Sequence, residues 1–204
     1  MKIGVIQASS QIEKNTILYE CTKDYGEVIN FGCFEDEENY SYVEIALEIC
    51  LLISSQAVDF IVTGCSSGQG MMIACNSLPN LICGYLPTPQ DAYLFGRIND
   101  GNVASLPLGL NYGWAGEINL KATLQQLFEE PFGIGYPLKD AKRKKKDTKK
   151  IKELNQLAKK DVITFLDELD QQMINKILSK KNVIDYILKY GKDQRIKQWI
   201  LNRR

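Results

Sequence analysis

The first two-thirds of the chain alternate short apolar runs with longer segments whose apolar residues recur every three or four positions. Runs of strand length occupy residues 2–7, 27–31, 58–62, 81–86 and 103–106. Helical periodicity marks residues 15–25, 41–54, 89–98 and 111–128, and a further helix is expected to start at residue 71. Strands that alternate with helices form parallel sheets covered on both faces. The pattern therefore predicts a doubly wound, three-layer α/β/α fold of Rossmann-like type, with five mostly parallel strands.

The pattern changes after residue 130. Two glycines between Pro131 and Pro137 interrupt any regular element, and charged side chains dominate residues 139–150. From about residue 151 apolar residues return at three- and four-residue spacing, which predicts helices with one apolar face. We therefore expect an α/β domain at residues 1–137, then a basic linker and a helical C-terminal extension at residues 138–204. The apolar face of the extension needs a partner surface, either on its own sheet or on another subunit.

Composition limits the class of protein. The 204 residues include 25 basic and 25 acidic side chains, so no net charge draws the chain towards nucleic acid or a membrane. The longest apolar run, residues 45–53, contains Glu48 and is shorter than the roughly 20 residues that span a bilayer. The N-terminus enters a strand without a signal-peptide pattern, and the six cysteines show no C-x-x-C or disulfide spacing. We expect a cytoplasmic protein without nucleic-acid or membrane partners.

The chain contains no histidine. This excludes Ser–His and Cys–His nucleophile pairs and every metal site that uses histidine. A general base must therefore be a cysteine, aspartate, glutamate, lysine or tyrosine. We expect neither a metal nor a cofactor.

The stretch with the clearest chemistry follows the third apolar run. Residues 63–70 form a turn of small and polar residues before the predicted helix. The backbone N–H groups of such a turn and of the helix N-terminus together favour an anion. The glycines do not match the dinucleotide fingerprint, and the lysine of a P-loop is absent. Cys65 stands in this turn, where the helix N-terminus favours a thiolate; the other interpretation is a small buried core residue.

Two segments resemble a known enzyme family. The first, Cys65-Ser66-Ser67-Gly68-Gln69-Gly70 continued to Asn76, resembles the Cys-Gly-Thr-Gly-x-Gly-x-x-x-Ala-x-Asn signature of the type B ribose-5-phosphate isomerases and galactose-6-phosphate isomerases. The second, residues 91–103, is similar to the family's Ala-x-x-x-Arg-x-His-Asn-x-x-Asn-Val segment and lies at the family's spacing. Together the matches cover roughly the first two-thirds of the chain.

The resemblance implies an aldose–ketose isomerase that moves a proton between adjacent carbons of a phosphorylated pentose or hexose through an enediolate. Cys65 takes the place of the family's base, and Asn99 that of a ligand to a sugar hydroxyl. The enediolate oxygens would be held by backbone N–H groups of Ser66, Ser67, Gly68, Gln69 and Gly70. In the family the Asn99 segment reaches a neighbouring subunit's site, which implies a homodimer or a dimer of dimers with the site at the interface.

The phosphate of such a substrate requires one or two cations. The candidates are Arg97 and, within the charged run, Lys142 and Arg143. A charged run is more often a solvated linker than a binding site, so both interpretations of residues 139–150 stay open.

Three places depart from the family pattern. Ile98 stands where the family has its ring-opening histidine, and Gly96 stands where it has an arginine. Ala8 and Ser9 replace an Asp–His pair. Ring opening then falls to Ser9, Ser10 or a water, or the substrate is largely open-chain, or the chemistry has been lost. The alternative to an isomerase is a non-catalytic sugar-phosphate-binding protein, which needs the anion-binding turn but no acid–base groups. A flavin or nucleotide binder is disfavoured because its fingerprints are absent.

Overall fold

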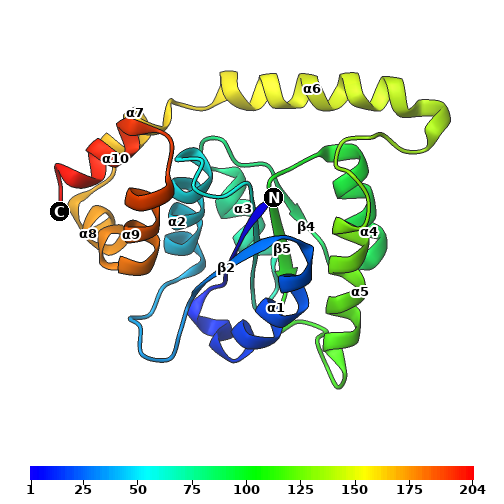
Figure 1. Cartoon of the computed structure of the whole chain (residues 1–204), viewed down its shortest axis with the longest axis horizontal. Coiled ribbons are helices and arrows are strands. Elements are labelled where there is room, and N and C mark those ends of the chain that lie inside the picture. Colours follow the sequence, from blue (N-terminus) through cyan, green and yellow to red (C-terminus); the bar gives the residue numbers. More distant parts are fainter.

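The computed structural model describes residues 1–204 and places a five-stranded sheet between two layers of helices (Figure 1). The strands are β1 (Lys2–Ile6), β2 (Glu27–Gly32), β3 (Phe60–Cys65), β4 (Cys83–Tyr85) and β5 (Val103–Pro107). They follow the order β2-β1-β3-β5-β4, and every neighbouring pair is parallel. The predicted doubly wound α/β fold is confirmed.

The helices divide between the faces of the sheet according to the direction in which the chain crosses it. The helices α2 (Tyr42–Ser54) and α3 (Gln69–Asn76) cover one face, and α1 (Asn15–Thr22), α4 (Pro89–Leu94) and α5 (Gly116–Phe128) cover the other. Right-handed crossovers explain this division, because α2 and α3 lead the chain one way across the sheet while α1 and α4 lead it back. Short 3-10 and π turns complete the elements at Ser9–Lys14, Lys23–Tyr25, Phe95–Asn99 and Leu138–Asp140.

Local sequence fixes where several helices begin. At α2 the Ser41 hydroxyl accepts a hydrogen bond from the Glu44 N–H at 3.3 Å, and the Glu44 carboxylate accepts one from the Ser41 N–H at 2.6 Å. This reciprocal pair is a capping box. The last helix of the α/β unit, expected from residue 111, starts later, at Gly116, because Asn111, Gly113 and Ala115 adopt positive φ angles that no helix accommodates.

The C-terminal extension consists of five helices: α6 (Ala141–Ala158), α7 (Val162–Asp167), α8 (Gln171–Ser179), α9 (Lys181–Tyr190) and α10 (Gln194–Leu201). The basic run that we expected to be a linker forms the first part of α6, which spans the molecule as a strap (Figure 1). The apolar residues of α7–α10 belong to the same core cluster as those of α2. The apolar faces of α7–α10 therefore pack on their own chain, whereas Ile151, Leu154 and Leu157 of α6 are exposed.

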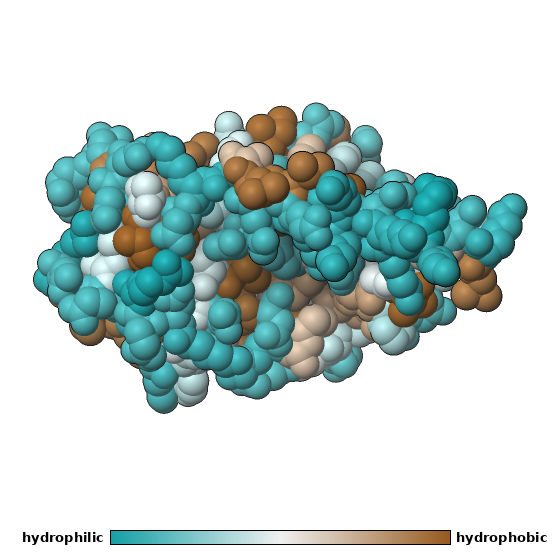
Figure 2. All heavy atoms as spheres, turned by 90° about the horizontal axis from the view of Figure 1, so that it is seen from above, coloured by the Kyte–Doolittle hydropathy of each residue, from teal (hydrophilic) through white to brown (hydrophobic).

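The strap is held at the amino edge of the sheet by polar contacts. The Thr148 hydroxyl donates to the Ile98 carbonyl, Lys152 pairs with Asp100, and the Lys159 ammonium donates to the Leu78 carbonyl at 2.6 Å. Figure 2, which looks down on the strap, shows a mainly hydrophilic surface interrupted by hydrophobic atoms. None of the helices combines the length and apolarity that a bilayer span requires.

A carboxyl group lies inside this core. Glu48 on α2 is fully buried, and neither of its carboxyl oxygens has a hydrogen-bond partner. Burial raises the pKa of Glu48 well above its ordinary value, and the charge of Lys180 offsets this only in part. The folded state therefore keeps a proton that the unfolded chain loses.

Replacing Glu48 with glutamine should stabilise the protein at alkaline pH and leave it unchanged in acid. In the wild type the raised pKa makes unfolding easier as the pH rises above the ordinary carboxyl pKa of 4.5. The variant has no such proton to lose, so at about pH 8 we expect a gain of about 1–3 kcal/mol in the free energy of unfolding. Urea titrations of both proteins at about pH 5 and about pH 8 measure this. An equal difference at the two pH values would contradict the buried-carboxyl explanation.

Candidate active site

The Cys65 turn lies at the carboxyl edge of the sheet, beside the turn that follows β1. Strands β1 and β3 are neighbours, and their connections leave towards opposite faces of the sheet. Such a switch point is where open α/β sheets bind ligands. Cys65 is the last residue of β3 and is 7% exposed, while Ser66 is exposed and Ser67 is half-buried.

The turn is pressed against the segment that follows β5. The N–H groups of Gly109 and Leu110 donate to the Ser66 carbonyl at 3.0 and 2.7 Å, and Leu108 donates to the Cys65 carbonyl at 3.0 Å. The Ser105 hydroxyl donates to the Gly68 carbonyl at 2.6 Å. These bonds fix the carbonyl groups of the turn on the protein side, so its N–H groups face the other way.

The backbone N–H groups of this turn are the feature that bears most directly on ligand binding. The backbone N–H groups of Ser66, Ser67, Gly68 and Gly70 donate to no protein acceptor, and the Gln69 N–H donates only to the Ser67 hydroxyl, at 3.3 Å. A helix N-terminus always leaves its first donors unpaired, and the four free groups of this turn are open to water or to an anionic ligand. Helix α3 begins directly after the turn and adds the partial positive charge of its N-terminus. The arrangement suits an oxyanion next to the Cys65 thiol.

The turn after β1 forms a second wall. The Ala8 N–H donates to the Gly64 carbonyl at 3.1 Å, and the Gln11 amide donates to the Ser66 hydroxyl at 3.0 Å. Ser9 is half-buried and Ser10 is exposed. The structure thus brings Ser9 and Ser10 to the same edge as Cys65. Sequence reasoning missed Gln11, although its position directly after Ser10 could have identified it.

The structure does not bring the other candidates to this edge within one subunit. Asn99 ends the turn that leads into β5, so it lies at the amino edge, and its side chain is exposed. Lys142 and Arg143 lie on α6, which crosses the same amino edge, and Arg143 pairs with Asp147 at 3.1 Å. Any role of these residues at a Cys65 turn requires a second subunit.

We expected Arg97 to contact phosphate, but the structure buries it completely. Its guanidinium donates to the Leu127 carbonyl at 2.8 Å and lies 5.6 and 5.3 Å from the ring centroids of Tyr93 and Phe132. Burial lowers the pKa of Arg97. Within this chain the arginine links the α4 region to α5, and its Nε and Nη1 atoms have no hydrogen-bond partner.

One cation does lie at the carboxyl edge, and sequence reasoning did not select it. Lys14 ends the short helix after β1, and its ammonium stands 4.8 Å from the ring centroid of Tyr112, in the loop that contacts Ser66. Its nearest acid, Glu13, is 4.0 Å away and is highly exposed. The Lys14 charge is therefore available to an acidic ligand at this edge.

The remaining cysteines differ from Cys65 in their surroundings. Burial raises the pKa of Cys50 to about 12 and also raises the pKa values of the Cys33 and Cys83 thiols. These thiols are unsuited to proton abstraction at neutral pH. Cys65 is the cysteine that stands beside free N–H donors at the ligand edge.

Comparison with known proteins identifies the family. Residues 3–145 match the ribose/galactose isomerase family, which covers more than half of the chain. The chain belongs to this family. A comparison with curated proteins gives no match.

Solved structures extend this relation to the full length. A 4-deoxy-L-threo-5-hexosulose-uronate ketol-isomerase, complexed with a tartrate, is 36% identical, with a TM-score of 0.95 over 100% of this chain and 99% of its own. A ribose-5-phosphate isomerase from Vibrio parahaemolyticus is 29% identical, with a TM-score of 0.94 over 100% and 99%. The chain is therefore a sugar isomerase, and the alternative of a non-catalytic binder is not supported.

Shorter solved structures match a smaller share of the chain. The type B ribose-5-phosphate isomerase of Trypanosoma brucei is 20% identical, with a TM-score of 0.63 over 75% of this chain and 97% of its own. This likeness shows the fold alone. The two full-length neighbours thus match the chain over the C-terminal extension as well, whereas this enzyme matches 75% of the chain.

Proposed function

We propose that the protein is a ketol-isomerase that uses Cys65 as general base and acts on an open-chain acidic sugar. The observation that supports this most directly is the row of free N–H groups beside the Cys65 thiol. The Cys65 thiolate would remove the proton from the carbon next to the carbonyl, and the N–H groups would hold the oxygens of the enediolate. The thiol would then return the proton to the neighbouring carbon while the hydroxyl proton passes from one enediolate oxygen to the other, so that the reaction is balanced without a co-reactant.

The chemistry of the sugar named for the full-length neighbour supports an open-chain substrate. A 4-deoxy-5-hexosulose-uronate has no hydroxyl at carbon 4 and a ketone at carbon 5, so it cannot close the usual furanose or pyranose ring. An enzyme for such a sugar needs no ring-opening acid. This agrees with Ile98, Ala8 and Ser9 at the positions where the family has its ring-opening and ring-binding residues.

The acidic group of the substrate can be a carboxylate or the phosphate that we predicted from the sequence. We favour the carboxylate, because Arg97 is buried and Lys14 lies against Tyr112, in the loop that contacts Ser66. A single lysine suits a singly charged group, whereas phosphate is usually bound by several donors.

Deuterium exchange tests both the reaction and the substrate class. The protein is incubated in heavy water with the 5-hexosulose-uronate, ribose-5-phosphate and galactose-6-phosphate, and each sugar is followed by proton NMR. We expect exchange and conversion on the uronate. Turnover of the sugar phosphates alone would show that the acidic group of the substrate is a phosphate and not a carboxylate. Exchange on none of the three sugars would contradict the proposed reaction.

The position of Asn99 leads us to propose a homodimer whose sites combine two subunits. In one chain Asn99 and Cys65 lie at opposite edges of the sheet, and Asn99 is exposed. A twofold dimer can bring Asn99 to the partner's Cys65 turn, where its amide would bind a sugar hydroxyl.

Mixing two inactive variants measures this arrangement. Cys65→Ala and Asn99→Ala homodimers each lack one group in both sites, whereas a mixed dimer carries both defects in one site and has its other site intact. After subunit exchange at equal concentrations we expect about a quarter of the wild-type activity. Light scattering shows whether the dimer exists, and a mixture that stays inactive despite subunit exchange would place both residues in the same chain's site.

A further inference from the structure

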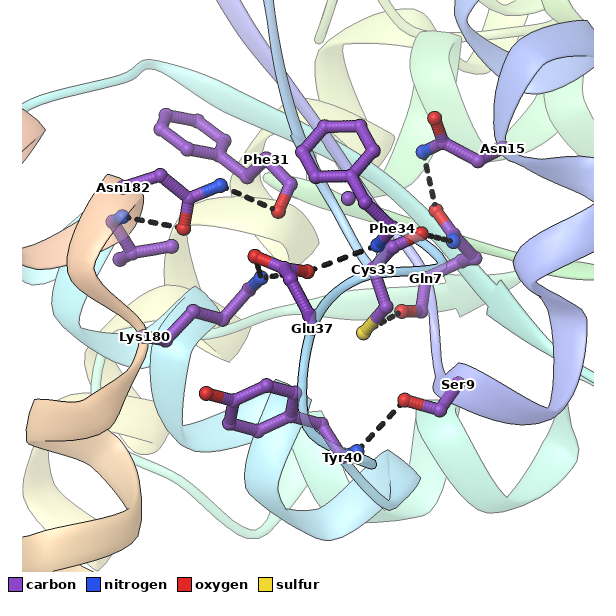
Figure 3. Close-up of polar contacts among 12 residues, drawn as sticks. Gln7, Ser9, Asn15, Phe31, Cys33, Phe34, Glu37, Tyr40, Lys180 and Asn182 are labelled. Carbon is purple, nitrogen blue, oxygen red and sulfur yellow. Dashed lines mark hydrogen bonds and ion pairs between the residues drawn. The ribbon is translucent and has the colours of Figure 1, made fainter.

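The loop between β2 and α2, residues 33–41, is fastened to the C-terminal extension by a partly buried ion pair (Figure 3). The Lys180 side chain is fully buried at the junction of α8 and α9, and its ammonium lies 2.8 Å from each carboxylate oxygen of Glu37. The Glu37 carboxylate also accepts a hydrogen bond from the Phe34 N–H at 2.9 Å. The pair therefore fixes the loop both to the extension and to itself.

The extension also holds Tyr40, at the end of this loop. The ammonium groups of Lys176 and Lys180 stand 4.3 and 5.0 Å from the centroid of the Tyr40 ring. The Tyr40 hydroxyl lies 2.9 Å from the hydroxyl of Ser179, at the end of α8. A buried ring with two cations and a hydrogen bond has little freedom to move.

The backbone of Tyr40 in turn holds Ser9, one of the candidate site residues. The Tyr40 N–H donates to the Ser9 hydroxyl oxygen at 2.7 Å, and the Ser9 N–H donates to the Tyr40 carbonyl at 3.0 Å (Figure 3). Because its oxygen accepts this bond, the Ser9 hydroxyl has one proton left to donate, either to the neighbouring Cys33 thiol or to a substrate oxygen. Two residues further on, Gln11 reaches the Ser66 hydroxyl of the Cys65 turn.

From this chain of contacts we propose that Lys180 is a positioning residue for the isomerase site. Through Glu37 and Tyr40, Lys180 sets the orientation of Ser9. The C-terminal extension thereby determines the conformation of the turn that follows β1. The role of Ser9 rests on the proposed function. A buried ion pair is a weak source of stability, so its presence here fits a role in fixing geometry.

Hydrogen exchange tests the mechanical part without requiring turnover. In Lys180→Met the amides of residues 33–41 and 7–12 should exchange faster than in the wild type, because Tyr40 is no longer held. Lys181→Met, at the next and exposed position, is the matched control and should match the wild type. If Lys180→Met does not fold, Glu37→Gln should show the same change to a smaller extent. Unchanged exchange in both segments would overturn the proposal.

A double-mutant cycle tests the link to Ser9. We expect Lys180→Met to lower kcat/KM by about 10- to 100-fold, as small misplacements in active sites do. In a Ser9→Ala background the same change should cost less than about 2-fold, because the group that Lys180 orients is already gone. Equal losses in both backgrounds would show that Lys180 acts on the fold in general. A wild type without turnover would instead count against the proposed function, and the exchange result would still decide the positioning role.

Discussion

Replacement of Cys65 by alanine should lower turnover by about 10²–10⁴-fold, the usual contribution of a general base. The variant loses the thiol but keeps the free N–H groups of the turn, since these belong to the backbone. Affinity for an unreactive acidic sugar analogue should therefore change little. The measurement is the rate of deuterium exchange at the carbon next to the carbonyl, together with the dissociation constant of the analogue by calorimetry.

Two further variants make this result specific. Cys65→Ser keeps the size and hydrogen bonding of the side chain, but its hydroxyl is far too weak an acid to supply an anionic base, so it should be as slow as alanine. Cys21→Ala removes a half-buried thiol on α1, outside the site, and should retain wild-type turnover. Undiminished exchange in Cys65→Ala would exclude Cys65 as the base.

Replacement of Gly68 by alanine should disable the site by deforming the turn. Gly68 has a φ of +74°, and a Cβ atom there would lie 2.8–2.9 Å from backbone atoms of Leu106 and Pro107. Backbone atoms of a buried strand cannot move aside easily, so the turn must shift and re-aim its N–H groups. We expect a loss of about 2–4 kcal/mol in the free energy of unfolding. Turnover should fall by about 100-fold or more.

The control for backbone strain is Gly113→Ala. Gly113 has a φ of +58°, but no heavy atom lies within 4 Å of a Cβ placed there. This variant should lose only the strain energy, about 1–2 kcal/mol, and keep its activity. Thermal melting and exchange assays on both variants separate strain from deformation of the turn. A Gly68→Ala enzyme as active as Gly113→Ala would show that the shape of the turn does not matter.

The sheet and the Cys65 turn were predictable because parallel strands buried on both faces leave continuous apolar runs. Such runs located β1, β3 and β5, and the small residues after β3 marked the turn. The basic part of α6 was misread as a linker because its helix has almost no apolar face at that end, so hydrophobic periodicity cannot reveal it. The strap is held instead by contacts such as Lys152 with Asp100 and Lys159 with the Leu78 carbonyl.

The surroundings of individual side chains could not be predicted from the sequence. An arginine near a family motif suggests a phosphate ligand, and nothing in the one-dimensional pattern shows that Arg97 is buried near the rings of Tyr93 and Phe132. Likewise, Lys180 and Glu37 are 143 positions apart, and their pairing follows only once α8 and α9 are packed on α2. The sequence does predict that the turn has free N–H groups, because a strand–turn–helix unit always leaves some donors unpaired. It does not predict which N–H groups these are.

The composition of helix α2 reflects its packing against the C-terminal extension. Eight consecutive residues, from Ile45 to Leu52, are all buried, so this helix has no water-facing side over that length. A helix that is buried all round needs cover on every side, and here the sheet, α3, α8 and α9 supply it. The side of α2 that packs against α8 and α9 is therefore suited to the full-length chain, because it would be open to water if those helices were removed.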